Sequence, residues 1–176
     1  IGALTRQRDV EFSQVAKDRL PLLAEAILQV GHRQTRNRGT VGGSLCQLDP
    51  AAEIPSVAMA MDAVITVANQ GGTRQIAMTD FPAGYMTPSM EPDELLTDIA
   101  FTPWPAGHGW SFLEYARRHG DFAIVSVAVL LAPGADGSIA RASITLGGVG
   151  SGPVRMTDAE ALLVGSRGNA AFDAAA

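Results

Sequence analysis

Residues 36–44 read RNRGTVGGS and residues 49–55 read DPAAEIP, and these two neighbouring stretches decide the interpretation of the chain. The adjacent glycines Gly42 and Gly43 mark a backbone that needs either a positive φ or the close approach of another group. The pair lies between a predicted loop and a predicted helix, where backbone N–H groups can hold a pyrophosphate without a lysine. Neither the Walker spacing nor the dinucleotide fingerprint is present, and the pair alone also fits a plain turn.

Helices and loops are predicted on both sides of this stretch. Residues 11–30 carry apolar side chains at helical spacing, with Pro21 suited to a first helical turn and Gly31 at the end, and they predict one helix. Residues 32–38 are polar and basic, which predicts a loop. Residues 51–61 again show helical spacing and predict a second helix.

Strands are predicted further along the chain. The β-branched residues 63–68, the turn 69–72 and the return strand 73–77 form a hairpin pattern, and residues 95–101 predict another short strand. Residues 102–109 hold two prolines and two glycines, the best candidate for a domain boundary.

The pattern of predicted elements differs in the second half of the chain. Residues 123–131 form an apolar run that fits either a buried helix or a buried strand, and residues 139–147 alternate as a strand does. Thr157 followed by Glu160 resembles a capping box and predicts a helix over 157–164. The whole chain is therefore predicted to be α+β.

Composition excludes several classes of function. The net charge of −5 argues against a nucleic-acid role that rests on phosphate electrostatics. The single cysteine, Cys46, excludes an internal disulfide and any iron–sulfur cluster built by this chain alone. No apolar run approaches a membrane span, and no signal peptide is visible, so a cytoplasmic location is expected. The three histidines share no metal-ligand spacing, and no metal ligand is assigned.

The two opening stretches resemble the second FAD-binding segment of the xanthine dehydrogenase and aerobic carbon monoxide dehydrogenase flavoproteins. That family has roughly R-N-x-G-T-[IV]-G-G-[NS], then D-P-x-[AS]-[DE]-x-P. Four other stretches continue the resemblance over nearly the whole chain: IGALT at 1–5, FPAGY at 81–85, DELL at 93–96 and RRHGDFA from 117.

The resemblance implies a fold and two domains. The fold is the second FAD-binding subdomain of the p-cresol methylhydroxylase and vanillyl-alcohol oxidase type, followed by the carbon monoxide dehydrogenase flavoprotein C-terminal domain, a small antiparallel sheet with helices. The first domain would cover residues 1–103 and the second residues 104–176. The family's A-G-G-x-[ST] loop and its D-x-R-x-S-x-x-Y-R segment have no match here, so both ends of the flavoprotein are expected to be missing.

The resemblance also assigns cofactor contacts and no catalytic residue. The positions that match cofactor-binding positions of the family are Val30, Thr40, Val41, Gly42, Gly43, Ser44, Glu53 and Leu96. Ser44 stands where relatives often have asparagine, and a hydroxyl reaches less far than an amide. Glu114 stands where xanthine dehydrogenases place a flavin-contacting lysine, a departure that bears on the tuning of the flavin and on any reaction with NAD.

By resemblance, the chain is the FAD-binding electron-transfer subunit of a molybdenum hydroxylase. The molybdenum cofactor and the iron–sulfur clusters would lie on two partner subunits, in a complex with two copies of each of three subunits. FAD would pass electrons from the clusters to an external acceptor. No nucleic acid and no membrane span are expected.

Two other functions stay open at this point. A self-standing flavin oxidase would need a substrate-facing base and a complete first subdomain. A non-redox interaction domain could keep the fold and lose the cofactor. The basic residues Arg33, Arg36 and Arg38 fit a solvated loop and a surface for a partner or for cofactor phosphates about equally.

Overall fold

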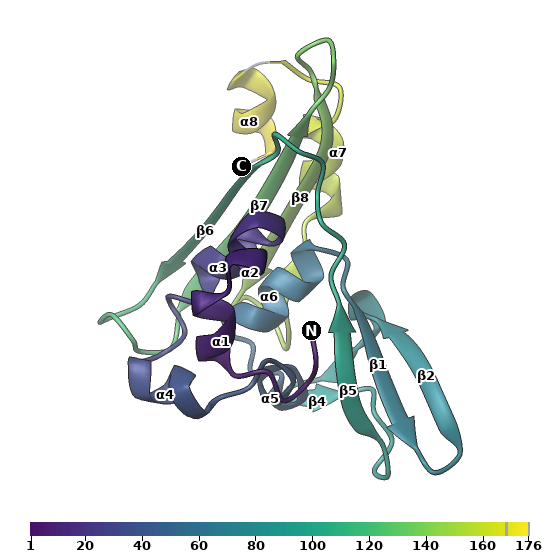
Figure 1. Cartoon of the computed structure of the whole chain (residues 1–176). Helices are drawn as coiled ribbons and strands as arrows, with labels where there is room; N and C mark the ends of the chain where they lie inside the picture. The colour runs from purple at the N-terminus through teal and green to yellow at the C-terminus, as the bar shows by residue number, and fades with distance from the viewer. Residues whose placement is uncertain (168, 176) are drawn as a thin grey trace.

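The computed structural model describes residues 1–167 and 169–175, and its architecture is α+β, as the sequence predicts (Figure 1). The first part consists of the helices α1 to α6 followed by the strands β1 to β5, and the second part consists of the strands β6 to β9 followed by two helices. The helices are α1 (Gln7–Phe12), α2 (Gln14–Arg19), α3 (Pro21–Ala26), α4 (Arg33–Arg38), α5 (Val41–Gln47), α6 (Glu53–Ala60), α7 (Thr157–Leu163), α8 (Asn169–Ala175) and the 3-10 turn η1 (Met78–Asp80).

The strands form three antiparallel sheets. They are β1 (Val64–Asn69), β2 (Gly72–Ala77), β3 (Pro82–Gly84), β4 (Thr87–Pro88), β5 (Leu95–Ala100), β6 (Gly109–Tyr115), β7 (Val125–Pro133), β8 (Ile139–Gly147) and β9 (Val154–Arg155). The orders are β2-β1-β5, β3-β4 and β6-β7-β8-β9. The larger two sheets lie on opposite sides of the helices α1 to α6 (Figure 1).

The predicted helix over 11–30 is wrong as a single element, because the chain breaks it into α1, α2 and α3. Ser13 ends α1 and caps α2, where its hydroxyl accepts a hydrogen bond from the Ala16 N–H. Leu20 has φ −134° and ψ 55°, outside the helical region. Pro21 disfavours a helical residue before it, and it begins α3 at the first helical position as predicted.

The predicted loop over 32–38 is a helix, α4, and its basic residues do not share one environment. Arg36 is buried and pairs with Glu11 on α1, while Arg33 and Arg38 are exposed. Arg36 also donates to the Val30 and Gly31 carbonyls at 3.1 and 3.3 Å. The tertiary contacts of Arg36 therefore hold this segment as a helix, which local composition does not reveal.

Helix α6 lies at the centre of the molecule, and all eight of its residues are buried. It packs on β7 and β8, so the apolar run 123–131 that fits either a helix or a strand forms a strand. On β8, Ser143 and Thr145 face this helix and are fully buried, and the Ser143 hydroxyl donates to the Ala60 carbonyl at 2.7 Å. Small side chains on this face allow the helix to approach the sheet closely.

The helix over 157–164 is confirmed as α7, but the capping box that predicts it is wrong. Met156, and not Thr157, occupies the N-cap, with no side-chain cap bond. Glu160 instead accepts a 2.7 Å hydrogen bond from the Ile144 N–H of β8 and an ion pair from Arg155. Within residues 1–167 and 169–175, no helix combines the length and the apolar character that a membrane crossing requires.

Candidate functional site

The Gly-Gly pair lies inside the first turn of α5, and its N–H groups are already occupied. Gly42 donates to the Ala3 carbonyl at 2.9 Å, and Gly43 donates to the Thr40 hydroxyl at 3.0 Å. Val41 donates to the Thr5 carbonyl and Ser44 to the Thr40 carbonyl. The expected use of these N–H groups as a pyrophosphate cradle is therefore not what this structure offers, and the hydroxyls of Thr40 and Ser44 are the donors left for an anion.

Close approach, and not a positive φ, is the reason for the glycines. Neither Gly42 nor Gly43 has a positive φ. A Cβ built on Gly42 would lie 2.7 Å from the Ala3 Cβ and 2.8 Å from its Cα and carbonyl oxygen. Helix α5 therefore rests directly on the first residues of the chain, and Gly42 fixes that distance.

Replacing Gly42 by alanine is expected to lower the free energy of unfolding by about 2 kcal/mol, because the backbone of Ala3 must shift to admit the methyl group. The gain in helix propensity of about 1 kcal/mol offsets only part of the clash. Urea denaturation measures the change. Gly109→Ala is the matched control, since a Cβ there meets nothing within 4 Å. Equal stability of the two variants would show that the contact with Ala3 does not constrain α5.

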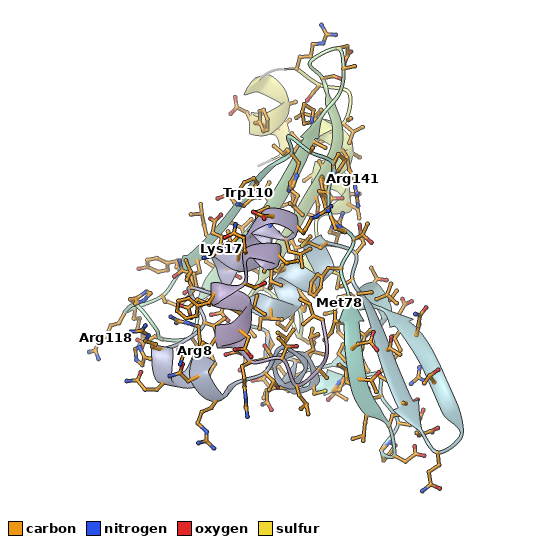
Figure 2. All side chains as sticks on the ribbon, viewed as in Figure 1. Arg8, Lys17, Met78, Trp110, Arg118 and Arg141 are labelled. Atoms are coloured by element: carbon orange, nitrogen blue, oxygen red, sulfur yellow. The ribbon has the colours of Figure 1, made fainter. Side chains whose placement is uncertain are left out.

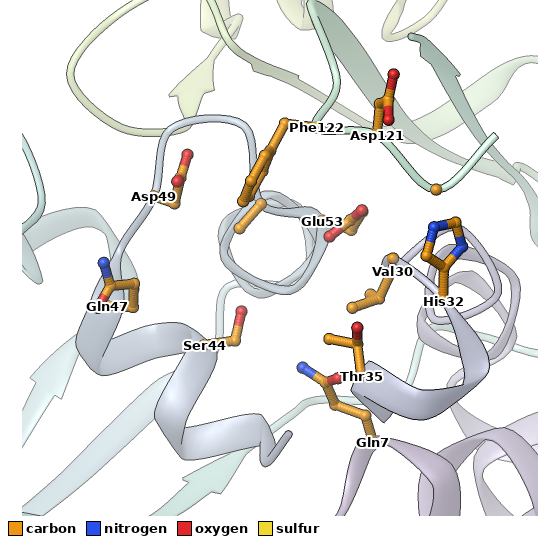
Figure 3. A pocket seen from close by; sticks show the side chains of 13 residues that line it. Gln7, Val30, His32, Thr35, Ser44, Gln47, Asp49, Glu53, Asp121 and Phe122 are labelled. Carbon is orange, nitrogen blue, oxygen red and sulfur yellow. The ribbon is translucent and has the colours of Figure 1, made fainter. Parts of the chain in front are cut away.

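A pocket of 490 Å³ lies on one side of α5, between α4, α6 and the loop after β6 (Figure 3). Figure 3 shows Ser44 and Glu53, from α5 and α6, beside the same space, with Phe122 above it. The lining residues are Gln7, Val30, Gly31, His32, Thr35, Ser44, Gln47, Asp49, Ala52, Glu53, Gly120, Asp121 and Phe122. The wall thus combines apolar surface with hydroxyl, amide and carboxyl groups at defined places.

Glu53 gives this pocket its unusual electrostatics. The side chain begins α6 and is 8 % exposed. Burial raises the pKa of Glu53 to about 7, and the negative charges of Glu114 and Asp49 add to the rise, while its own backbone N–H stabilises the anion in part. A carboxyl of this kind both accepts and donates hydrogen bonds near neutral pH, which suits a ligand rich in hydroxyls.

Glu114 lies close enough to Glu53 for its charge to act on it. Burial raises the pKa of Glu114 as well, against an opposing effect of His119. Its Oε2 atom is buried and has no hydrogen-bond partner within the described part of the chain. Glu114 therefore contributes a second acid to the neighbourhood of the pocket.

A second pocket, of 580 Å³, lies on the other side of the same turn. Thr40, Gly42, Gly43 and Leu96 line it, together with Ala3, Leu4, Cys46, Thr87, Pro88, Met90, Glu91, Glu94 and Leu95. Leu4 and Leu95 are 84 % and 74 % exposed, so its rim is strongly apolar. Burial raises the pKa of the Cys46 thiol, whose sulfur lies 4.0 Å from that of Met90, which fits a packed side chain and not a reactive one.

The structure sorts the eight expected contact residues into two groups and one exception. Val30, Ser44 and Glu53 line the first pocket, and Thr40, Gly42, Gly43 and Leu96 line the second. Val41 is fully buried and lines neither. Other residues line the first pocket that the sequence did not assign to it, chiefly Gln7, Thr35, Asp121 and Phe122. The last two belong to the RRHGDFA stretch, and they reach the pocket only through the fold.

Gly120 explains how the second half of the chain reaches this pocket. Its φ is +88°, and the ring of His32 lies against its Cα so closely that no Cβ would fit. The loop after β6 is therefore held on α4, with Asp121 and Phe122 at the mouth of the pocket. Two pockets, with polar groups and apolar surface, thus flank the Gly42–Gly43 turn, and clefts of this kind are where small-molecule ligands usually bind.

Comparison with known proteins identifies the family. Residues 1–104 match the family described as the FAD binding domain in molybdopterin dehydrogenase, and residues 110–176 match the CO dehydrogenase flavoprotein C-terminal domain. The chain belongs to this molybdopterin dehydrogenase flavoprotein family, which confirms both the resemblance and the fold class.

The relatives are subunits of named dehydrogenases. The 6-hydroxypseudooxynicotine dehydrogenase complex subunit alpha of Paenarthrobacter nicotinovorans is 40 % identical over 94 % of this chain and 56 % of its own length. The carbon monoxide dehydrogenase medium chain of Afipia carboxidovorans is 32 % identical, over 94 % and 57 %. The solved carbon monoxide dehydrogenase from Hydrogenophaga pseudoflava superimposes with a TM-score of 0.95 at 32 % identity, covering 99 % of this chain and 61 % of that one. The chain thus spans about three fifths of the relatives it matches.

Proposed function

We propose that this chain carries part of the FAD site in the medium subunit of a molybdenum hydroxylase, and that the subunit passes electrons from iron–sulfur clusters to an external acceptor. The observation that carries the proposal is the placement of seven matched contact residues on two pockets around the Gly42–Gly43 turn. Bound FAD would supply the redox chemistry, and the protein supplies binding, orientation and electrostatics.

The side chains present fit such a cofactor. Thr40 and Ser44 offer hydroxyls to its phosphates, and Glu53 offers an acceptor to its hydroxyls. Val30 and Leu96 offer apolar surface to its rings. Burial raises the pKa of both Glu53 and Glu114, and the charge of Glu114 adds to the rise at Glu53, so a proton on Glu53 is favoured more than in an exposed carboxyl.

The proposal extends to partners and domains. An iron–sulfur subunit and a molybdenum subunit would complete the complex, with two copies of each of three subunits, in the cytoplasm. The relatives include a subunit of a dehydrogenase complex and a medium chain, which supports a multi-subunit assembly. We place the two domains at residues 1–103 and 104–176, a division supported by separate family matches over residues 1–104 and 110–176.

Ser44→Ala is expected to weaken FAD binding about tenfold, the effect of one lost hydrogen bond to a charged group. No hydrogen bond of the Ser44 hydroxyl to the described residues is found, so the change removes no internal contact. Titration of the purified chain with FAD, followed by flavin fluorescence and melting temperature, measures the affinity. Ser151→Ala, at an exposed serine, is the matched control.

The same titration separates the rival functions. Equal affinity of wild type and Ser44→Ala would remove Ser44 from the site. No stabilisation of the chain, or of a longer version of it, by FAD would favour a non-redox interaction domain. Reduction of bound flavin by an organic substrate without any partner subunit would favour a self-standing oxidase.

A further inference from the structure

Exposed arginines form a basic face on three neighbouring elements. They come from α1 and the residue before it, from α4, and from the loop after β6, and they are Arg6, Arg8, Arg33, Arg38, Arg117 and Arg118. None of the six makes an ion pair with a described residue. They are nearly half of the 13 Lys and Arg residues in a chain whose net charge is −5, so positive charge is concentrated on this face.

Side-chain contacts join the α1 and α4 parts of the basic face. Arg6 donates to the carbonyl of Arg38, and Arg8 donates to the side-chain oxygen of Asn37 at 3.4 Å. The Arg8 guanidinium also lies over the Phe12 ring, 5.6 Å from its centroid, and that side chain is 56 % exposed. Arginine and aromatic side chains are enriched at protein interfaces, so this part of the face suits a protein partner.

The third part of the basic face lies against α4, beside the first pocket. Gly120 packs on the His32 ring, and this contact brings the loop with Arg117 and Arg118 to α4. Figure 2 shows Arg118 on the same side of the molecule as Arg8. His32 and Gly120 line the first pocket, whereas none of the six arginines lines it. The cations therefore lie beside the mouth of the pocket and do not converge inside it, as a phosphate site would require.

Acids on the same elements leave most of this charge uncompensated. Glu11 forms its ion pair with Arg36, which is buried and is not one of the six. Asp9 and Asp121 are exposed, and neither makes an ion pair within the described chain. Two exposed carboxylates thus stand against six exposed guanidinium groups.

From this arrangement we infer that the basic face docks an acidic one-electron carrier protein, as the external acceptor, at the mouth of the first pocket. This inference rests on the proposed electron-transfer function. Because the chain as a whole is acidic, an acidic partner is attracted to this face in preference to the others, which orients the encounter. Transient redox partners meet through small interfaces, whereas permanent subunit interfaces are larger and more apolar. Each electron pair that leaves the subunit would reduce two oxidised carriers by one electron each, and the two accompanying protons go to water.

A plant-type ferredoxin, which is a small acidic carrier, is the probe, and calorimetric titration of the whole chain without FAD is the measurement. We expect ferredoxin to bind. Its affinity should fall at least tenfold when the ionic strength rises from about 0.01 M to about 0.15 M, because the screening length shortens from about 30 Å to about 8 Å. Millimolar pyrophosphate at matched ionic strength is expected to change the affinity less than twofold, since a small anion cannot cover the face.

The double variant Arg33→Gln/Arg118→Gln removes two charges from the basic face and is expected to weaken ferredoxin binding about tenfold. Arg19→Gln/Arg167→Gln is the matched control, because it removes the same charge from exposed arginines outside the face and should change the affinity less than twofold. Absence of ferredoxin binding, equal effects of the two double variants, or displacement of ferredoxin by pyrophosphate would each overturn the assignment.

A second measurement separates the external carrier from a permanent subunit. A longer version of Arg33→Gln/Arg118→Gln is expected to co-purify with its partner subunits as the wild type does. Loss of assembly would overturn the inference and assign the basic face to a partner subunit. Ferredoxin binding is measured without flavin, so a failure of docking and a failure of FAD binding are told apart.

Discussion

Arg36→Met is expected to lower the free energy of unfolding by about 3–5 kcal/mol. The variant leaves the nearly buried carboxylate of Glu11 without its ion-pair partner, and it removes the hydrogen-bond donor of two backbone carbonyls. The Arg36 side chain is 10 % exposed and that of Glu11 is 13 % exposed, with Nε to Oε2 at 2.9 Å. The same guanidinium donates to the carbonyls of Val30 and Gly31. The hydrogen bond from Arg36 holds the pKa of Glu11 below its usual value. The ionised Glu11 therefore stabilises the wild type near neutral pH, and this contribution is lost as pH falls. In Arg36→Met it is absent already at neutral pH.

Urea denaturation near neutral pH tests this expectation, with Arg33→Met as the control. Arg33 lies on the same helix, is exposed and makes no ion pair with a described residue, so a change within about 0.5 kcal/mol is expected. Because Val30 and Gly31 form one wall of the first pocket, Arg36→Met should also weaken FAD binding. A loss of stability no larger than that of Arg33→Met would show that the ion pair of Arg36 with Glu11 contributes nothing to the stability of the fold.

The contacts of Arg36 show why local sequence predicted some elements and not others. The hairpin at 69–72 is confirmed because its signal is local: two strands meet there through a short glycine turn. Residues 32–38 carry no apolar stripe, so nothing local indicates α4. The helix depends on the contact of Arg36 with Glu11, which is 25 positions away. Likewise, the break at Ser13 is not visible in the helical spacing of 11–30.

The candidate site, too, was predictable from the sequence only in part. The residue types around Gly42 could be assigned from the match of the opening stretches, and seven of the eight reach a pocket. The role of the glycines could not be assigned, because it depends on Ala3, which packs against them from the start of the chain. The contribution of Gly120 to Phe122 depends on the seating of a loop on His32, which only the folded chain establishes.

Glu53→Gln is expected to remove a pH dependence of stability that the wild-type chain shows between about pH 4.5 and 7. The pKa of Glu53 rises from 4.5 to about 7 on folding, so the folded state holds the proton more tightly than the unfolded state does. Stability therefore falls as pH rises through this window, by up to about 3 kcal/mol. The neutral amide has no such penalty, and the variant should be the more stable protein at pH 8 and about equal to wild type at pH 4.

Urea denaturation of the apo chain across this pH range measures the effect, with Glu91→Gln as a control at an exposed carboxylate. Glu114→Gln gives a second test, because loss of the Glu114 charge should lower the pKa of Glu53 and narrow the window. An unchanged pH profile in Glu53→Gln would mean that another group titrates there. Glu53 lines the first pocket, so the same variant links stability to cofactor binding. Because the carboxyl lowers stability above neutral pH, we expect it to strengthen cofactor binding in return, and Glu53→Gln should bind FAD more weakly.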